Sequence, residues 1–175
     1  MIIEDYQRAF GIDYTILRYG SLYGRRSNEL NFIHQIVKQA LEKKTVTRKG
    51  DGEEIREYIH VEDAARCSVD VLDEEFKNQH VIITGTQSIK VKDLLGMVKE
   101  IFKDDIRIDY LPQDDRHYRY SLTPYTFQPK LAKKLVLNHY HDLGQGILDV
   151  IHEMYQTSIK ENKLLGDIDL HVDAP

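Results

Sequence analysis

Short apolar runs suited to buried strands alternate along the chain with helical patterns, and few folds accommodate that order. Residues 13–19 (DYTILRY) and 81–85 (VIITG) are rich in β-branched and aromatic residues, as buried strands are. Residues 30–43 and 91–101 instead place apolar side chains at helical spacing. The alternation predicts an α/β fold.

Two strand-like segments flank a glycine-rich turn. Residues 46–48 and 54–61 are predicted to be strands, and Gly50-Asp51-Gly52 between them has the composition of a tight turn. The pattern therefore predicts a β-hairpin. Asp63 follows the second strand and is predicted to cap the next helix, because a carboxylate accepts hydrogen bonds from the first amide groups of a helix.

The last third of the chain is less regular. Alternation over residues 106–110 predicts a strand, and residues 131–135 and 143–154 are predicted to form a short and a longer helix. Residues 113–129, with several tyrosines and two prolines, show little periodicity. We expect an ordered loop there.

Length and composition exclude several classes of protein. The 175 residues match one ordinary domain, and no apolar run approaches the roughly 20 residues that span a bilayer. A formal charge of -5 argues against a nucleic-acid binder with a basic surface, and the single cysteine, Cys67, excludes an internal disulfide framework. We expect a cytoplasmic protein with neither nucleic-acid nor membrane partners.

The first helical pattern begins abruptly. Ile2, Ile3, Tyr6 and Phe10 mark one face of a helix, yet no capping residue precedes Ile2. We expect the sequence to start inside an element of a larger protein.

A glycine-punctuated segment, predicted to be a loop over residues 20–28, follows the first strand. Ligands of open α/β sheets bind beyond the carboxyl ends of strands, so Ser21 and Tyr23 lie where a ligand is expected. A tight turn that needs Gly20 and Gly24 for backbone reasons explains the pattern equally well. Both interpretations remain open from the residues alone.

Strand alternation places Arg56, Tyr58 and His60 on one face of the strand over residues 54–61. The planar fork of arginine suits phosphate or carboxylate recognition, and a phenol and an imidazole can complete a polar pocket. The alternative is a solvated hairpin face on which Arg56 pairs with a nearby glutamate.

Motifs for cofactors and metals are incomplete. Neither a G-x-G-x-x-G nor a G-x-x-x-x-G-K-[ST] sequence follows any predicted strand. His139 and His141 lie close to each other beside Asp142, but a third ligand at a recognised spacing is missing, so we expect no metal site. The residues alone indicate an α/β fragment with a pocket for an anionic small molecule.

Four stretches carry a family pattern: residues 14–25 (YTILRYGSLYGR), Gly50-Asp51-Gly52, residues 55–65 (IREYIHVEDAA) and residues 81–85 (VIITG). In this order they resemble the C-terminal half of the NAD-dependent epimerase/dehydratase family, the extended short-chain dehydrogenases. The run from Arg56 to Asp63 is the most specific part of the resemblance.

The resemblance implies a Rossmann-type fold that lacks its N-terminal dinucleotide-binding strands. Residues 1–19 would be a remnant of the Rossmann domain, residues 20–163 the substrate-binding portion and residues 164–175 a disordered tail. The family's glycine-rich fingerprint and its catalytic Y-x-x-x-K would lie upstream, because Glu4 matches a glutamate four residues beyond that lysine. No catalytic residue is therefore expected in this sequence.

The resemblance also implies which residues bind ligands. On the cofactor side they are Gly20 and Tyr19, near the nicotinamide. On the substrate side they are Ser21, Tyr23, Asn31, Arg56, which matches an arginine that grips the diphosphate, and Arg116, with Arg119 as an alternative to it.

We therefore predict the substrate-binding part of an NAD(P)-dependent nucleotide-sugar epimerase or dehydratase. It would bind a nucleotide-diphospho-sugar or a similar anion, and it would be inactive and bind no NAD or NADP alone. A non-catalytic binding or assembly module derived from the same fold is the alternative. Without the first strands of the sheet, the helix over residues 2–10 and the strand over 14–19 would expose apolar surface, so we also predict self-association.

Overall fold

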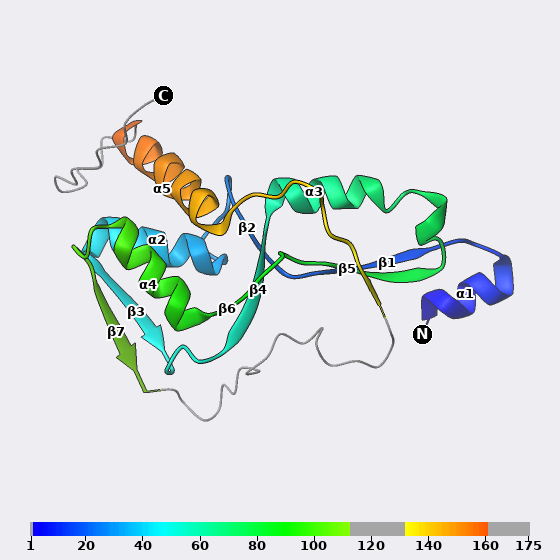
Figure 1. Ribbon diagram of the computed structural model, residues 1–175, viewed down its shortest axis with the longest axis horizontal. Helices are drawn as coiled ribbons and strands as arrows, with labels where there is room; N and C mark the ends of the chain where they lie inside the picture. Colours follow the sequence, from blue (N-terminus) through cyan, green and yellow to red (C-terminus); the bar gives the residue numbers. More distant parts are fainter. Residues whose placement is uncertain (1, 113–131, 161–175) are drawn as a thin grey trace.

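The computed structural model describes residues 2–112 and 132–160. Helices and strands alternate through most of the chain, which agrees with the predicted α/β class (Figure 1). The helices are α1 (Ile2–Phe10), α2 (Phe32–Lys43), α3 (Val61–Asp70), the 3-10 helix η1 (Glu74–Phe76), α4 (Val91–Ile101) and α5 (Leu143–Lys160). The strands are β1 (Thr15–Tyr19), β2 (Ser21–Tyr23), β3 (Thr45–Lys49), β4 (Ile55–His60), β5 (Gln79–Ile83), β6 (Ser88–Lys90), β7 (Arg107–Leu111) and β8 (Lys133–Lys134).

The strands form three small sheets that are mostly parallel. One sheet has the order β1-β5-β8, with Leu17 beside Val81, and both of its pairs are parallel. A second has the order β2-β4-β6, in which β4 is parallel to β2 and antiparallel to β6. The third is the parallel pair β3-β7. Parallel neighbours need long crossovers, and helices supply most of these connections.

The predicted hairpin over residues 46–61 is wrong. β3 pairs with β7, so that Val46 lies beside Ile108, whereas β4 lies in a different sheet. The glycine turn between them forms hydrogen bonds with other parts of the chain. The Gly50 amide donates to the Leu111 carbonyl at 2.9 Å, and the Lys92 amide donates to the Gly52 carbonyl at 2.9 Å. The turn therefore separates two strands instead of closing them into a pair.

The prediction that Asp63 caps α3 is wrong. The helix begins at Val61, and its N-cap is His60, whose ring nitrogen Nδ1 accepts from the Glu62 amide at 3.4 Å. Asp63 lies inside the first turn and is only 3% exposed, and its carboxylate accepts two hydrogen bonds from His141. The carboxylate therefore joins two distant segments instead of ending a helix.

Two short strands replace other predictions. β2 lies inside the segment predicted to be a loop over residues 20–28, and its main-chain pairing with β4 makes it a strand despite its length. β8 occupies part of the predicted helix over residues 131–135, because that segment adds to the edge of β5.

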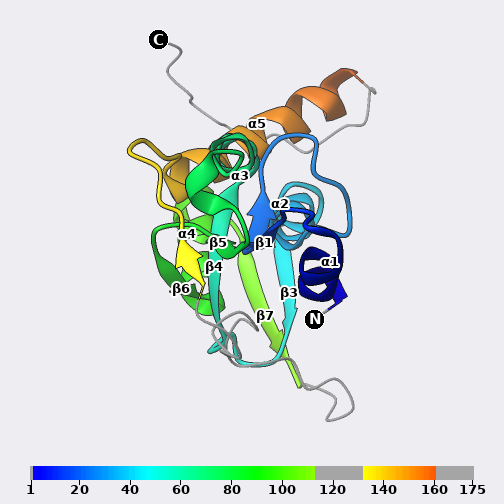
Figure 2. The same cartoon turned by 90° about the vertical axis from the view of Figure 1, so that its right-hand side faces the viewer.

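Two separate hydrophobic cores stabilise the fold. The larger core is formed by α2, α4 and α5 with the strands beside them, and it contains Leu94, Leu95 and Ile147, all 0% exposed. The smaller core lies between α3, η1 and the β1-β5 pair, and it contains Val81 and Ile83, also 0% exposed. Figure 2 shows the strands passing through the middle of the molecule, with the helices around them.

The two cores meet at β4. Its neighbours Tyr58 and Ile59 point to opposite sides, and Tyr58 belongs to the larger core while Ile59 belongs to the smaller one. Gly85, just beyond β5, lies directly on this strand, since a Cβ atom added at Gly85 would be 1.9 Å from the Tyr58 carbonyl oxygen. Only glycine fits at this crossing of two backbones.

Helix α1 lies at one end of the molecule, beside the β1-β5 sheet (Figure 1). Its apolar side chains are exposed, Ile2 to 75%, Tyr6 to 55% and Phe10 to 68%. Its buried contact is polar: Glu4 is 8% exposed and lies 3.3 Å from Nε2 of His80 on β5. The exposure of apolar surface at this end agrees with the expectation from the sequence.

Several expectations fall outside the described residues, namely the ordered loop over 113–129, the tail over 164–175 and the arginines Arg116 and Arg119. In the described parts of the chain, no helix combines the length and apolar character that crossing a membrane requires.

Candidate functional site

Three of the predicted substrate-side residues line one cavity. Ser21 comes from β2, Asn31 from the start of α2 and Arg56 from β4, and together they border a space of about 200 Å³. The three positions are up to 35 residues apart in sequence (56 − 21 = 35). The fold, and no local motif, brings them together.

Parallel pairing and a helix cap position these side chains. In the β2-β4 pair Ser21 lies beside Tyr58, which also borders the cavity. Asn31 is the N-cap of α2: its Oδ1 accepts from the His34 amide at 3.1 Å, and its Nδ2 donates to the Leu22 carbonyl at 2.6 Å. Asn31 thus fixes α2 to β2, because both ends of its amide are used in the protein.

A buried ion pair, which the sequence did not predict, completes the cavity wall. Arg48 and Glu54 form a salt bridge whose side chains are 10% and 12% exposed. The Arg48 guanidinium also lies 5.3 Å from the centre of the Phe32 ring. Arg56 adds a second guanidinium, with one nitrogen donating to the Ile55 carbonyl at 2.8 Å. Two arginines and one glutamate give the lining a net positive charge, which favours an anionic ligand.

The pairing of Arg48 with Glu54 had only a weak signal in the sequence. The two residues lie on either side of the Gly50-Asp51-Gly52 turn, so a turn alone brings them close. The predicted hairpin did not suggest a buried ion pair, because a flat hairpin would leave the side chains of Arg48 and Glu54 in solvent.

A second cavity of about 120 Å³ also borders Tyr58. Tyr23 borders this second cavity and not the first one. The family resemblance had assigned Tyr23 to the substrate side. Tyr23 is 3% exposed, and its ring meets the rings of Tyr58 and His60 edge to face, with centroids 6.4 and 5.4 Å away. Burial raises the pKa of the Tyr23 hydroxyl, and Asp63 and other nearby carboxylates add to this effect.

The residues predicted to lie near the nicotinamide border neither cavity. The Tyr19 hydroxyl is hydrogen-bonded to the Ser68 hydroxyl on α3. The Gly20 amide donates to the Ile83 carbonyl at 2.9 Å, which continues the β1-β5 pairing past the end of β1. Both residues are thus bonded to β5 or α3, although Gly20 is the chain neighbour of Ser21, which borders the Arg56 cavity.

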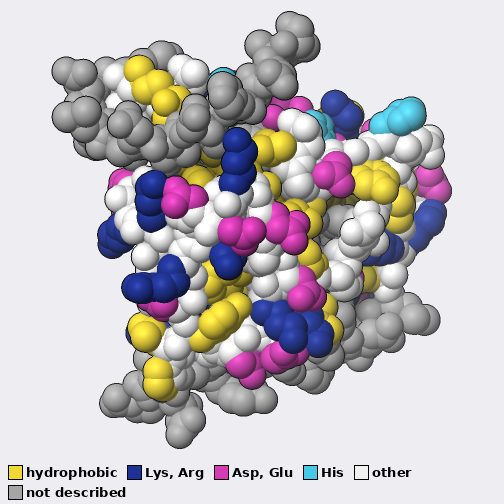
Figure 3. Space-filling view, turned by 60° about the vertical axis from the view of Figure 1, so that its left-hand side comes forward, with side chains coloured by type: hydrophobic (Ala, Val, Ile, Leu, Met, Phe, Trp, Pro, Cys, Tyr) yellow, Lys and Arg dark blue, Asp and Glu magenta, His cyan; other side chains and the backbone are white. Residues whose placement is uncertain are grey.

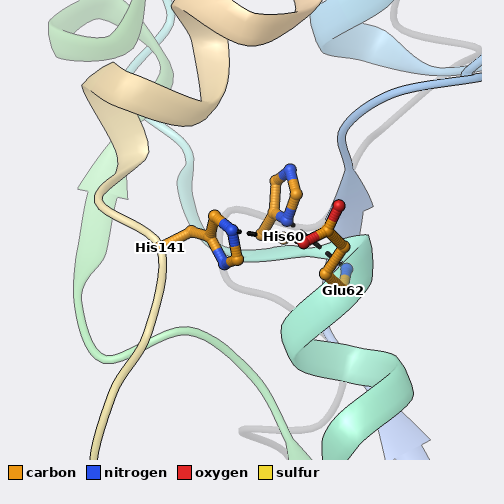
Figure 4. Close-up of side chains that lie close together, drawn as sticks. All are labelled: His60, Glu62 and His141. Atoms are coloured by element: carbon orange, nitrogen blue, oxygen red, sulfur yellow. Dashed lines mark hydrogen bonds and ion pairs between the residues drawn. The ribbon is translucent and has the colours of Figure 1, made fainter.

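Histidines and carboxylates gather at the start of α3 (Figure 4). His60 and His141 stack with ring centroids 4.1 Å apart and planes 24° from parallel. The Glu62 carboxylate lies 3.4 Å from Nε2 of His141, and the Asp63 carboxylate lies 2.8 Å from its Nδ1. Burial lowers the pKa of His60, and the neighbouring His141 ring lowers it further. This polar cluster borders the second cavity.

Charges of both signs are interspersed over the face shown in Figure 3. Exposed charges of the described residues often form pairs: Lys90 and Lys92 both contact Glu53, at 2.9 and 2.5 Å, and Lys44 contacts Asp105 at 2.6 Å. Exposed pairs of this kind contribute little to stability and form no single-sign patch. An anion is therefore better recognised inside the cavity at Arg56 than on this surface.

Comparison with known proteins assigns the family. Residues 1–84 match the model of the NAD dependent epimerase/dehydratase family. A putative UDP-glucose 4-epimerase of Methanocaldococcus jannaschii is 31% identical over 157 residues, which are 87% of this chain and 49% of that protein. An uncharacterized UDP-glucose epimerase, YtcB, of Bacillus subtilis is 29% identical over 97 residues, 55% of this chain and 31% of that protein.

Solved structures of the same fold also align with most of this chain and with half of their own. The UDP-glucose 4-epimerase of Thermotoga maritima, solved with UDP-glucose, has a TM-score of 0.67 at 23% identity over 90% of this chain and 50% of that one. The UDP-glucuronic acid 4-epimerase of Bacillus cereus, solved with UDP-glucuronic acid and NAD, has a TM-score of 0.70 at 22% identity over 88% and 49%. The chain spans about half the length, or less, of the relatives it matches, and it belongs to the NAD-dependent epimerase/dehydratase family.

Proposed function

We propose that this chain supplies the nucleotide-sugar-binding half of an NAD(P)-dependent epimerase or dehydratase of the cytoplasm. The observation that carries the proposal is the convergence of Ser21, Asn31 and Arg56 on one positively charged cavity. Family membership supports the assignment of a nucleotide-diphospho-sugar to this cavity, since relatives of the same fold were solved with UDP-sugars.

The roles follow from the chemistry of the side chains. Arg56 binds the diphosphate, because a guanidinium offers paired donors to phosphate oxygens. The Ser21 hydroxyl donates to or accepts from the sugar or an adjoining group. Asn31 acts mainly by holding α2 against β2, because its amide already bonds Leu22 and His34. The Arg48–Glu54 pair forms a rigid polar wall.

The chemical step belongs to residues that this sequence does not contain. In the family, hydride passes between a sugar carbon and the dinucleotide while a tyrosine moves the proton. The 175 residues include neither a Y-x-x-x-K nor a G-x-x-G-x-x-G sequence. We propose that the chain alone is inactive and that NAD or NADP is held by the complete enzyme, with Gly20 and Tyr19 near the nicotinamide. These two assignments, and those of Tyr23 and Arg116 to the substrate side, stay predictions.

Titration of the 175-residue chain with UDP-glucose and with uridine tests the cavity. The variant Arg56→Ala should weaken UDP-glucose binding by about tenfold or more, since a charged hydrogen bond contributes about 1.5–3 kcal/mol. Uridine, which has no diphosphate, should bind the variant and the unmodified chain equally. The control is Arg107→Ala, because that side chain is 74% exposed and lies outside the cavity.

Two results would contradict the substrate assignment. One is equal UDP-glucose affinity for the unmodified chain and Arg56→Ala, and the other is no binding by the unmodified chain at millimolar ligand. Binding should be followed through the amide NMR signals, which report whether the shifted residues border the Arg56 cavity or the Tyr23 cavity.

A complementation experiment distinguishes the proposed enzyme half from the alternative, a non-catalytic binding or assembly module. The N-terminal half of the Methanocaldococcus jannaschii relative should restore epimerase activity when mixed with this chain, and Arg56→Ala should reduce that activity. If the two parts associate without any activity, the module is the better interpretation.

A further inference from the structure

Two histidines and a glutamate converge at the N-terminus of α3 from segments far apart in sequence (Figure 4). His60 ends β4, Glu62 lies in the first turn of α3, and His141 precedes α5. Each offers one ligand atom, and the three atoms lie within 4.8 Å of one another. Within residues 2–112 and 132–160 this is the one grouping of three histidine, cysteine or acidic side chains with that spacing.

We propose that His60, Glu62 and His141 bind a divalent transition-metal ion of the zinc type. Imidazole nitrogen is a preferred ligand of Zn²⁺ and its neighbours in the first transition row, and two histidines with one carboxylate form a known donor set for such ions. Mg²⁺ and Ca²⁺ prefer all-oxygen sites, so they do not fit this set. The inference does not depend on the nucleotide-sugar proposal.

Asp63 prepares His141 for this role. Its buried carboxylate accepts from the His141 amide at 2.7 Å and from Nδ1 of the same residue at 2.8 Å. With the proton on Nδ1, the lone pair of the ring lies on Nε2, which faces Glu62 at 3.4 Å. A carboxylate behind a ligating histidine is the usual support of a metal-bound imidazole, since it fixes both the tautomer and the orientation of the ring.

His60 is held in place before any ion arrives. The residue is 2% exposed, and its ring packs closely against Gly24. A Cβ atom added at Gly24 would be 2.9 Å from Nε2 of His60. The ring nitrogen of His60 on the Glu62 side is Nδ1, which accepts a long hydrogen bond of 3.4 Å from the Glu62 amide, whereas Nε2 points away from the cluster (Figure 4). An ion bound by His60 would therefore take Nδ1 and replace this hydrogen bond. The neighbouring Glu62 side chain is 53% exposed and can move towards an ion.

Binding requires a small rearrangement. The ligands of a tetrahedral zinc ion with bonds of about 2.0–2.2 Å lie about 3.3–3.5 Å apart, so ligand atoms that are up to 4.8 Å apart must approach by up to about 1.5 Å. The stacked rings of His60 and His141 must also tilt, because an ion lies in the plane of each imidazole that binds it. The exposed Glu62 and the partly exposed His141 ring supply this freedom.

Local spacing in the sequence offers no third ligand for His141, so no metal site was expected there. Positions 60 and 141 are 81 residues apart (141 − 60 = 81), and only the fold reveals their contact.

Titration of the 175-residue chain, free of any histidine tag, with Co²⁺ tests the proposal, because the visible absorption of Co²⁺ reports nitrogen coordination. We expect one Co²⁺ per chain, displaced by one equivalent of Zn²⁺. Glu62→Gln and His141→Gln should each weaken binding by tenfold or more, and Asp63→Asn should weaken it by about 10–100-fold, as is usual for a supporting carboxylate.

The matched control is His139→Gln, since His139 is exposed, lies two residues from His141 and is outside the cluster. It should bind Co²⁺ as tightly as the unmodified chain. Far-ultraviolet circular dichroism shows whether each variant is folded, and Glu62→Gln keeps the test valid if the histidine variants do not fold, because Glu62 is exposed. Zn²⁺ should also raise the Tm of the unmodified chain but not that of Glu62→Gln.

The proposal is wrong if the unmodified chain gives no Co²⁺ absorption, or if Glu62→Gln binds as tightly as the unmodified chain. It is equally wrong if His139→Gln loses binding to the same extent. The cluster would then be a hydrogen-bonded contact between α3 and the segment before α5, without a metal.

Discussion

The two hydrophobic cores of this chain differ in how completely they are enclosed. The larger core has α2, α4 and α5 around it, and 17 buried residues of the described ranges share it. The smaller core has 7 buried residues and borders the sheet in which β1 is an edge strand, next to the exposed helix α1. The difference indicates that the part around the Arg56 cavity supplies its own core, whereas β1 lies at the edge of its sheet in the described part of the chain.

The largest expected effect on the free energy of unfolding comes from truncating one buried side chain in each core. Leu94→Ala and Ile83→Ala each remove a fully buried side chain and should cost about 2–5 kcal/mol of unfolding free energy. We expect Leu94→Ala near the upper end of this range, because surroundings closed on every side relax less around a cavity.

Chemical denaturation of both variants measures this difference. Leu30→Ala is the control, because Leu30 is 91% exposed and its loss should change stability by less than about 0.5 kcal/mol. A larger loss for Ile83→Ala than for Leu94→Ala would show that the smaller core is the more tightly enclosed one.

A pair of glycines tests the packing of the larger core. A Cβ added at Gly146 would lie 2.5 Å from the Tyr23 hydroxyl oxygen, so Gly146→Ala should cost about 1–3 kcal/mol despite the better helix propensity of alanine. At Gly96 no atom lies within 4 Å of the added Cβ, so Gly96→Ala should gain about 0.5–1 kcal/mol. Thermal unfolding measures the stability of both variants. If Gly146→Ala were stabilising as well as Gly96→Ala, close contact of α5 with Tyr23 would be refuted.

The cap of α2 connects the larger core to the Arg56 cavity. Asn31→Ala should cost about 0.5–2 kcal/mol, because it removes the acceptor for the His34 amide as well as the donor to the Leu22 carbonyl. Asn138→Ala, at an exposed position, should leave stability unchanged. A variant Asn31→Ala of full stability that binds UDP-glucose poorly would assign Asn31 to the ligand instead of the fold.

The smallest effect on stability is expected at α1. The double variant Tyr6→Ser with Phe10→Ser should change the unfolding free energy by less than about 0.5 kcal/mol, since both rings are exposed. It should nevertheless reduce the predicted self-association, because it removes the apolar face.

Sedimentation velocity over a range of concentrations measures that association. Arg8→Ser is the control on the same helix, as that side chain is 72% exposed and apolar contacts are untouched. An unmodified chain that stays a compact monomer at high concentration would contradict the prediction.

Periodicity predicted those elements that carry their own apolar pattern. The helices α2, α4 and α5 and the strands β1, β5 and β7 were found because each has several apolar residues at the spacing of its structure. β2 and β8 were missed, because strands of 3 and 2 residues are too short for a period and depend on their neighbours.

Strand partners could not be read from the sequence, because they depend on residues far along the chain. The Gly50-Asp51-Gly52 turn was located correctly, but β3 and β4 then enter different sheets. Asp63 was given the local role of a cap, whereas its partner, His141, lies 78 residues away. Ser21 and Arg56 were already candidates from strand ends and strand alternation, and the family resemblance added Asn31; their roles in binding stay predictions.

Gly85 approaches β4 where the two cavities share a residue. Tyr58 borders both of them, and a Cβ atom at position 85 would overlap its carbonyl oxygen. A side chain larger than hydrogen at this position would therefore force β4 and the segment after β5 apart. The absence of a side chain at Gly85 thus sets the shape of the wall that the two cavities have in common.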